Sequence, residues 1–130
     1  MRLCAEGCGM VRTILVADDD PLIRKTLCEF FESEEGHEVC AEARNGREAI
    51  DLALKHRPHL IIPDLSMPVM NGVDASRELK RIMPTVPIIL FTLYADIENE
   101  ILAADLLVDN VVSKGDVRNL MGNMRSLIPV

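Results

Sequence analysis

Short apolar runs rich in branched residues alternate along the chain with segments in which apolar residues recur every three or four positions. The short runs predict buried parallel strands, and the longer periodic segments predict helices. Together they indicate five strand and helix units joined by short connections. The expected strands cover 14–17, 39–43, 60–64, 87–92 and 110–113, and the expected helices cover 21–35, 45–57, 75–83, 96–107 and 117–128.

This alternation predicts an α/β fold in which helices cover both faces of a parallel sheet, linked by right-handed crossovers. Residues 11–130 then form one domain, and residues 1–10 form a leader that we expect to be disordered. Cys4 and Cys8 in this leader have a spacing that a metal half-site or a disulfide could use, but a frayed tail is the favoured interpretation.

Composition narrows the classes of function. The net charge of −7 argues against direct nucleic-acid binding, because phosphate contacts need a basic face and the 14 Lys and Arg residues are scattered. No apolar run has membrane-spanning length, and residues 1–9 lack the apolar stretch of a signal peptide. We therefore expect a cytoplasmic protein whose partners are other proteins.

Acidic residues follow two of the expected strands. Asp18, Asp19 and Asp20 come directly after the first strand, and Asp64 ends the third. The carboxyl ends of parallel strands meet at one edge of the sheet, where open α/β sheets bind ligands. Carboxylates gathered there repel one another and need a cation, for which Mg²⁺ suits hard oxygen ligands. Asp20 is expected to cap the following helix, which leaves Asp18 and Asp19 as the functional pair.

Two further strands end in residues that complete this chemistry. Asp64 is the candidate nucleophile, since a carboxylate can attack a phosphoryl group once cations neutralise the charge. Thr92 offers a hydroxyl to a phosphoryl oxygen, and Lys114 offers an ammonium to Asp64 or to that oxygen. Asp19 and Asp64 would bind the metal directly, Asp18 through a water, and the backbone carbonyl of Ser66 could complete the set.

At these positions the sequence resembles the receiver domain of two-component response regulators, over about residues 12 to 129. Because Lys114 is followed by glycine, it is most similar to receivers that are usually fused to a helix-turn-helix output domain. The resemblance implies a flavodoxin-like, doubly wound sheet of five parallel strands in the order 2-1-3-4-5, flanked by five helices. The segments that carry it are ILVADDDPLIRKTL, ARNGREAIDLA, LIIPDLSMPVMNG, PIILFT and VVSKGD.

The resemblance also implies roles and partners. Asp64 matches the phospho-acceptor, Asp18 and Asp19 the acidic metal pocket, Thr92 the switch hydroxyl and Lys114 the phosphoryl-sensing lysine. A sensor histidine kinase or a phosphotransfer protein would donate the phosphoryl group, and the receiver would catalyse its own phosphorylation and dephosphorylation, as a switch more than a metabolic enzyme. The output surface would lie around residues 96–129, with a homodimer as one outcome of phosphorylation.

Three departures from the family pattern keep alternatives open. Pro63 precedes Asp64 in an expected central strand, Leu93 replaces a small residue after Thr92, and Val111 replaces a frequent aromatic. One alternative is therefore a degenerate receiver that binds a partner without being phosphorylated. The other rests on a different feature: the run from Asp18 to Asp20 also fits the Asp-x-Asp strand end of phosphatases similar to haloacid dehalogenases, in which Asp18 would be the nucleophile. It leaves the segment after Asp64 unexplained.

Overall fold

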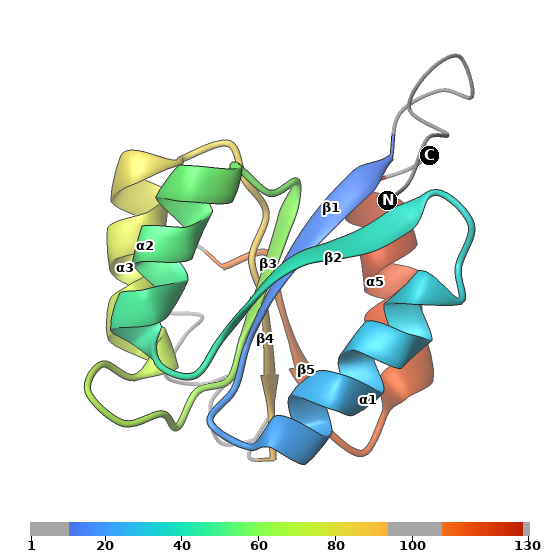
Figure 1. Ribbon diagram of the computed structural model, residues 1–130, viewed down its shortest axis with the longest axis horizontal. Helices are drawn as coiled ribbons and strands as arrows, with labels where there is room; N and C mark the ends of the chain where they lie inside the picture. The colour runs from blue at the N-terminus through green and yellow to red at the C-terminus, as the bar shows by residue number, and fades with distance from the viewer. Residues whose placement is uncertain (1–10, 94–107, 129–130) are drawn as a thin grey trace.

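The computed structural model describes residues 11–93 and 108–128. Within these two ranges the chain forms five strands and four helices (Figure 1). The expected leader at 1–10, with its two cysteines, and the expected helix at 96–107 lie outside the described residues. The strands are β1 (Arg12–Ala17), β2 (His37–Ala43), β3 (Leu60–Pro63), β4 (Ile89–Thr92) and β5 (Asn110–Ser113), and the helices are α1 (Pro21–Glu32), α2 (Gly46–His56), α3 (Gly72–Ile82) and α5 (Val117–Leu127).

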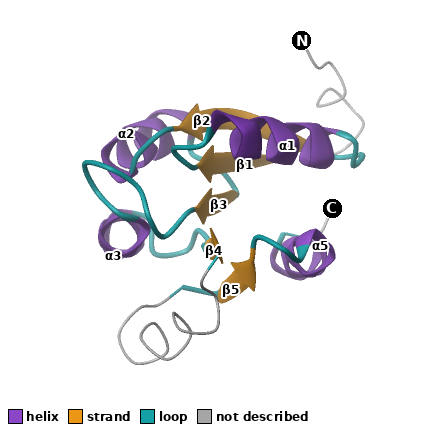
Figure 2. Cartoon of the chain, turned by 90° about the horizontal axis from the view of Figure 1, so that it is seen from below, coloured by secondary structure: helices purple, strands orange, loops and turns teal. Residues whose placement is uncertain are grey.

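All of the strands run parallel, and Figure 2 shows them following one another as β2, β1, β3, β4 and β5. Their hydrogen bonds form two ladders, β2-β1-β3 and β4-β5. A parallel bridge between Ile61 and Ile88 connects the ladders. The expected parallel α/β architecture is confirmed, and apart from this bridge the hydrogen bonds of the sheet are interrupted between β3 and β4.

The division coincides with Pro63, the last residue of β3. On the side of β3 that faces β4, the N–H of Ile61 donates to the carbonyl of Pro87 at 3.1 Å. On the side that faces β1, the N–H of Asp64 donates to the carbonyl of Ala17 at 2.8 Å. Because successive residues of a strand turn their amides to opposite sides, position 63 faces β4. Proline has no N–H, so the bond that would continue the ladder toward β4 cannot form.

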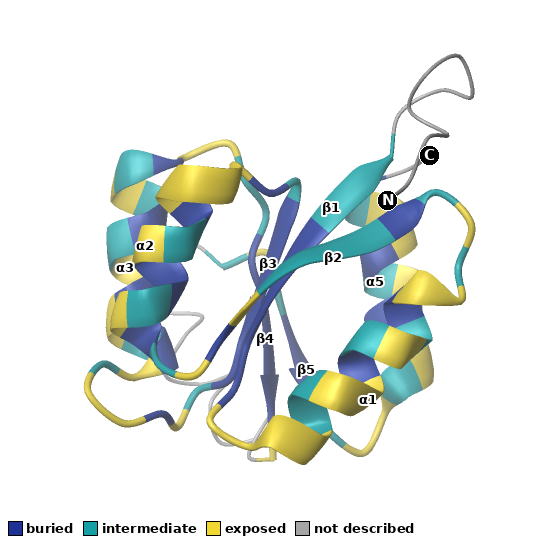
Figure 3. Cartoon of the chain, in the orientation of Figure 1, coloured by how far each residue is buried: buried dark blue, intermediate teal, exposed yellow. Residues whose placement is uncertain are grey.

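Helices cover both faces of the sheet, with α1 and α5 on one face and α2 and α3 on the other (Figure 1). Side chains of β1 alternate between these layers. Ile14 and Val16 join the core cluster with α1 and α5, while Leu15 and Ala17 join the cluster with α2 and α3. Buried positions accordingly follow β1, β3, β4 and β5 and the inner faces of the helices, whereas the edge strand β2 is mostly of intermediate burial (Figure 3).

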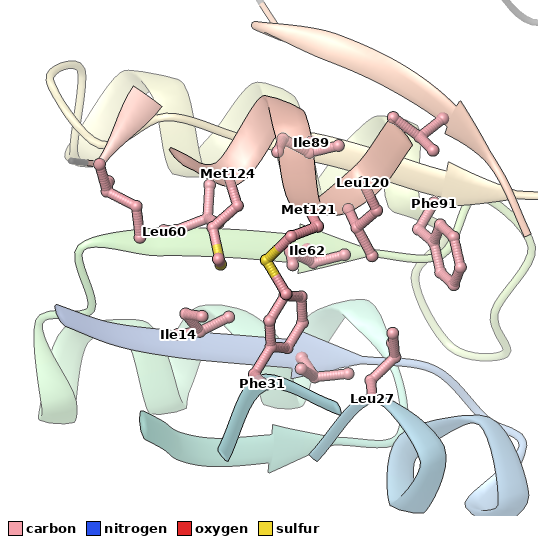
Figure 4. Packing of buried hydrophobic residues seen from close by; sticks show 13 residues of the cluster. Ile14, Leu27, Phe31, Leu60, Ile62, Ile89, Phe91, Leu120, Met121 and Met124 are labelled. Atoms are coloured by element: carbon pink, nitrogen blue, oxygen red, sulfur yellow. The ribbon is translucent and has the colours of Figure 1, made fainter. Parts of the chain in front are cut away.

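The first of these clusters packs α1 and α5 together on one face of the sheet. Phe31 of α1 and Met121 of α5 point toward each other beside Ile62 of β3 (Figure 4). Phe31 is fully buried and Met121 is 6% exposed. None of the described helices is long and apolar enough to cross a lipid bilayer.

A polar side chain directly before each described helix fixes where that helix begins. The Oδ1 atom of Asp20 accepts the N–H of Leu22 at 2.9 Å, which confirms the expected cap of α1. Asn45, Asn71 and Asp116 cap α2, α3 and α5 in the same way. Each of these helices follows a strand, so the caps lie at the carboxyl edge of the sheet and shape the loops there.

Candidate functional site

The turn after β1 separates two neighbouring carboxylates. Asp18 is 2% exposed, and its main-chain N–H donates to the Ala43 carbonyl of β2 at 3.0 Å. Its Oδ1 atom accepts the N–H of Asp20 at 2.9 Å. Asp19, in contrast, is exposed. The turn therefore buries one carboxylate in the edge of the sheet and presents the next to solvent.

Asp64 is held by a close return of the chain after β3. Its side chain is buried, and the segment that follows folds back so that the N–H of Gly72 donates to the Leu65 carbonyl at 2.8 Å. A Cβ atom on residue 72 would lie 2.1 Å from the carbonyl oxygen of Asp64. Only glycine allows this approach, so Gly72 helps to fix the backbone that carries the acid.

Lys114 connects the two buried acids. Its main-chain N–H donates to the Thr92 carbonyl at 2.9 Å, which carries the β4–β5 ladder one residue beyond β5. Its Nζ atom lies 2.7 Å from Oδ2 of Asp18 and 3.2 Å from Oδ2 of Asp64. The ends of β1, β3 and β5 thus converge on one ammonium group, as the order of acids and lysine in the sequence predicted.

Thr92 and Ser66 lie beside this centre. Thr92 ends β4, is 1% exposed and pairs with Ser113 in the β4–β5 register, so it lies at the same edge of the sheet as Lys114. Ser66 is exposed, in the loop two residues beyond Asp64. The structure brings Asp18, Asp64 and Lys114 into direct contact, and it places these two residues on neighbouring segments.

Burial and mutual repulsion set the charge states in the pocket. Burial, with a further contribution from the charge of Asp18, raises the pKa of the Asp64 carboxyl to about 6, although Lys114 acts in the opposite direction. Burial disfavours the charge on Lys114, but hydrogen bonds and attraction from both acids outweigh it and raise the pKa of the lysine. Lys114 therefore remains positive at neutral pH and stabilises two acids that repel each other.

The acids are arranged in a way that suits a divalent cation. One carboxylate oxygen each from Asp18, Asp19 and Asp64 lie within 4.8 Å of one another. Lys114 supplies one positive charge against three carboxylates, which leaves an excess of negative charge, and Asp19 opens the group to solvent. Oxygen ligands of this kind fit Mg²⁺, which binds through a few carboxylates and keeps several waters.

Apolar side chains surround the approach to the pocket. Leu22, Val69 and Leu93 are 67%, 84% and 67% exposed; Leu22 lies in the first turn of α1, and Val69 and Leu93 lie in loops that follow β3 and β4. Leu93, one of the departures from the family pattern, therefore projects outward beyond Thr92. Val111 is 9% exposed and packs with Leu90, so this second departure fills a small core.

One residue of this region was missed by the sequence interpretation. Arg24 of α1 donates from Nη1 to the main-chain carbonyl of Asp18 at 2.7 Å. A signal existed in the sequence, because a cation near the start of a helix opposes the helix dipole and so needs a specific partner. The partner itself, a backbone carbonyl, cannot be read from side-chain types.

Comparisons with known proteins agree with this geometry. The family model described as the response regulator receiver domain matches residues 14–125. The transcriptional regulatory protein PdtaR of Mycobacterium tuberculosis strain H37Rv is 45% identical over 83 residues, which cover 62% of this chain. The chain spans 40% of the length of PdtaR.

Solved structures show the same architecture. The receiver domain of the response regulator AraT from Geobacillus stearothermophilus is 33% identical with a TM-score of 0.78, over 90% of this chain and 95% of that one. The response regulator TrrA of Thermotoga maritima, solved in complex with Mg²⁺ and BeF, is 30% identical with a TM-score of 0.80, over 90% of this chain and 99% of that one.

Proposed function

Because the chain belongs to the response regulator receiver domain family, we propose that Asp64 accepts a phosphoryl group from a phosphohistidine of a sensor histidine kinase or a phosphotransfer protein. Magnesium-dependent phosphorylation of an aspartate is the general function of this family. The observation that carries the proposal is the meeting of Asp18 and Asp64 on the ammonium group of Lys114. This contact gives Asp64 a cationic neighbour at the end of a central strand.

The transfer forms one bond and breaks one. A carboxylate oxygen of Asp64 attacks phosphorus, and the bond between phosphorus and the donor's imidazole nitrogen breaks. The incoming phosphoryl oxygens bring negative charge next to existing carboxylates, so the step depends on neutralisation. Lys114 provides one positive charge within 3.2 Å of Asp64, and bound Mg²⁺ would supply the remaining electrostatic stabilisation.

The surroundings of each acid divide the metal ligands. Both carboxylate oxygens of Asp18 already accept bonds, one from the Asp20 N–H and one from Lys114. We therefore assign Asp19 and Asp64 as direct ligands of Mg²⁺ and Asp18 as a ligand through water. The backbone carbonyl of Ser66, in the loop beyond Asp64, completes the protein's share.

Phosphorylation changes what Lys114 and Thr92 contact. Once Asp64 is an acyl phosphate, its carboxylate charge has moved outward to the phosphoryl oxygens, and Lys114 follows that charge. The Thr92 hydroxyl donates to another phosphoryl oxygen. Because Lys114 precedes α5 and Thr92 ends β4, both movements act on the expected output surface at 96–129, of which β5 and α5 are described.

The proposal also covers the cellular compartment and the form of output. Exchange with the kinase takes place in the cytoplasm, in line with the free thiols of Cys28 and Cys40. A homodimer formed on phosphorylation is one form of output, and no direct contact with nucleic acid is assigned to this chain. The similarity to receivers fused to a helix-turn-helix domain remains a prediction.

The family match argues against one of the two alternatives, the phosphatase, and does not distinguish the other, the degenerate receiver. The receiver family match over residues 14–125 includes Asp64 and the loop behind it, which the phosphatase alternative leaves without a role. The degenerate receiver has the same fold and differs only in chemistry. It is therefore separated from the proposed function by experiment.

A matched pair of variants provides that experiment. The protein is incubated with Mg²⁺ and acetyl phosphate, and intact mass spectrometry counts the phosphoryl groups. We expect one adduct on the wild type and none on Asp64→Asn. Asp20→Asn is the control, because it removes the same charge nearby and retains a residue that caps helices well.

Two results would contradict the proposal. An adduct that persists in Asp64→Asn would move the acceptor elsewhere, first to Asp18. A wild type that gains no phosphoryl group, and whose NMR spectrum does not respond to beryllofluoride with Mg²⁺, would establish the degenerate receiver.

A further inference from the structure

Arg24 lies where an unpartnered cation would be unfavourable. It is the fourth residue of α1, near the positive end of the helix dipole, and its side chain is 14% exposed. Nearby residues of α1 such as Leu22 and Lys25 are exposed. Contacts specific to Arg24 must therefore offset the cost of placing its guanidinium there.

Two acceptors hold this guanidinium. Nη1 donates to the main-chain carbonyl of Asp18 at 2.7 Å, and Nε lies 3.4 Å from Oε1 of Glu42 on β2. Asp18 is also bonded to β2 through its own N–H, which donates to Ala43. Arg24 thus joins the start of α1, the end of β1 and the end of β2 around the main chain of Asp18.

The Asp18 carbonyl that Arg24 holds belongs to the peptide group that joins Asp18 to Asp19. We propose that Arg24 is a positioning residue, which fixes this peptide so that the carboxylate of Asp18 turns inward to Lys114 while that of Asp19 turns outward to the metal. A planar peptide whose carbonyl is held by a charged donor has little freedom to rotate. The inference rests on the proposed function, because it concerns how the same acids receive Mg²⁺.

Positioning and simple charge have opposite consequences for metal affinity. A cation near a metal site repels Mg²⁺, so if Arg24 acted only through its charge, removing it would strengthen binding. If Arg24 orders the acids, then in its absence the acids must be ordered when Mg²⁺ binds. The cost of that ordering reduces the free energy of binding, so the affinity falls. The sign of the change therefore identifies the role.

The test measures the Kd of the full chain for Mg²⁺ by titration calorimetry, without a phosphoryl donor. We expect Arg24→Ala to raise the Kd about tenfold, the size expected for the loss of one charged hydrogen bond. Arg24→Lys keeps the charge but cannot span both acceptors, so its Kd should fall between those of the wild type and Arg24→Ala. Thermal unfolding and circular dichroism verify that each variant is folded.

Arg125→Ala is the matched control. Arg125 pairs with Glu34 at 2.6 Å, between the end of α5 and the end of α1, so its removal deletes the same charge and one ion pair at the opposite edge of the sheet. Its Kd for Mg²⁺ should equal that of the wild type. A Kd for Arg24→Ala that is unchanged or lower, or a Kd for Arg24→Lys equal to that of the wild type, would overturn the positioning role.

The outcomes also distinguish the positioning role of Arg24 from the proposed function of Asp64 as phosphoryl acceptor. A wild type that binds Mg²⁺ and is phosphorylated on Asp64, with unchanged affinity in both Arg24 variants, contradicts the role of Arg24 alone. A wild type that binds no Mg²⁺ contradicts both.

Discussion

Lys114 shares one positive charge between two buried carboxylates, at unequal distances. Its Nζ atom is closer to Asp18, at 2.7 Å, than to Asp64, at 3.2 Å. Asp18 is thus the more fully compensated of the two, while burial and the charge of Asp18 raise the pKa of Asp64 to about 6. The less compensated carboxylate is the one to which we assign the chemistry.

A second ionisable contact, far from the acids, gives a pH dependence of stability. The Thr13 N–H donates to Nδ1 of His59 at 2.9 Å, so the imidazole must be neutral there. Burial, and then the charge of Arg12, lower its pKa in the folded state. Because the folded pKa lies below the unfolded value, this contribution is complete above the unfolded pKa and is lost as the pH falls through both values. We expect a loss of about 1 kcal/mol, the worth of one hydrogen bond.

The measurement compares the urea unfolding of the wild type and of His59→Asn in EDTA. The pH is varied from about 7.5 to about 5, a range that includes the ordinary pKa of histidine. Asparagine offers an acceptor that does not titrate, so the stability of the wild type should fall relative to the variant as the pH falls. Asp64 contributes in the opposite sense, because its raised pKa makes the fold more stable on acidification, and it cancels in the difference. A difference that does not vary with pH would contradict this contribution.

At the scale of elements, the loop between β3 and α3 depends on one glycine. Gly72→Ala would place a Cβ atom 2.1 Å from the Asp64 carbonyl oxygen, so the backbone carrying the acid must move. We expect a loss of about 2 kcal/mol in the free energy of unfolding, as for other overpacked sites. Phosphorylation by acetyl phosphate should also be slower.

Gly122→Ala is the control for this change. Residue 122 is exposed within α5, and a Cβ atom there would meet nothing within 4 Å. Alanine should therefore stabilise the helix by about 1 kcal/mol and leave phosphorylation unchanged. Equal effects of the two substitutions on stability would refute the close approach at Gly72.

The described elements were predictable because their causes are local, although α3 begins at Gly72 and not at the expected residue 75, because Asn71 caps it. Apolar periodicity and capping side chains such as Asn45 act within a few residues, and the order of acids and lysine at strand ends predicted that these side chains meet at one edge of the sheet. Val69 was not predictable, since it has a φ of 68°, which a β-branched residue rarely adopts. The neighbouring bonds impose that conformation: the Gly46 N–H donates to the Met70 carbonyl at 2.8 Å, a contact between distant loops.

At the scale of the whole molecule, the sheet consists of two ladders that the Ile61–Ile88 bridge connects and that separate at Pro63. Pro63→Val would supply the missing N–H, and we expect it to donate to the carbonyl of Ile89, which continues the bond between Ile61 and Pro87. Its exchange with solvent deuterium should then be as slow as that of the Asp64 amide, which bonds to Ala17 on the other side. Fast exchange at position 63 in the folded variant would show that the proline does not cause the division.

The division matters because the acids and the lysine belong to different ladders. Asp18 and Asp64 extend from β1 and β3, whereas Lys114 and Thr92 extend from β5 and β4. The ion pairs of Lys114 therefore join the two parts across the site itself. A change of charge on Asp64 acts directly on this connection, which is how we expect a local reaction to reach the output surface.

The central claim is that Asp64 is the phosphoryl acceptor, and chemical reduction of the phosphorylated protein can locate the acceptor residue. The wild type is incubated with Mg²⁺ and acetyl phosphate, then reduced with borohydride, which converts an aspartyl phosphate to homoserine. Peptide mass mapping locates the homoserine. We predict homoserine at position 64 and at no other aspartate position. Homoserine at position 18 would contradict it in favour of the phosphatase chemistry, and an unmodified Asp64 would contradict phosphoryl acceptance.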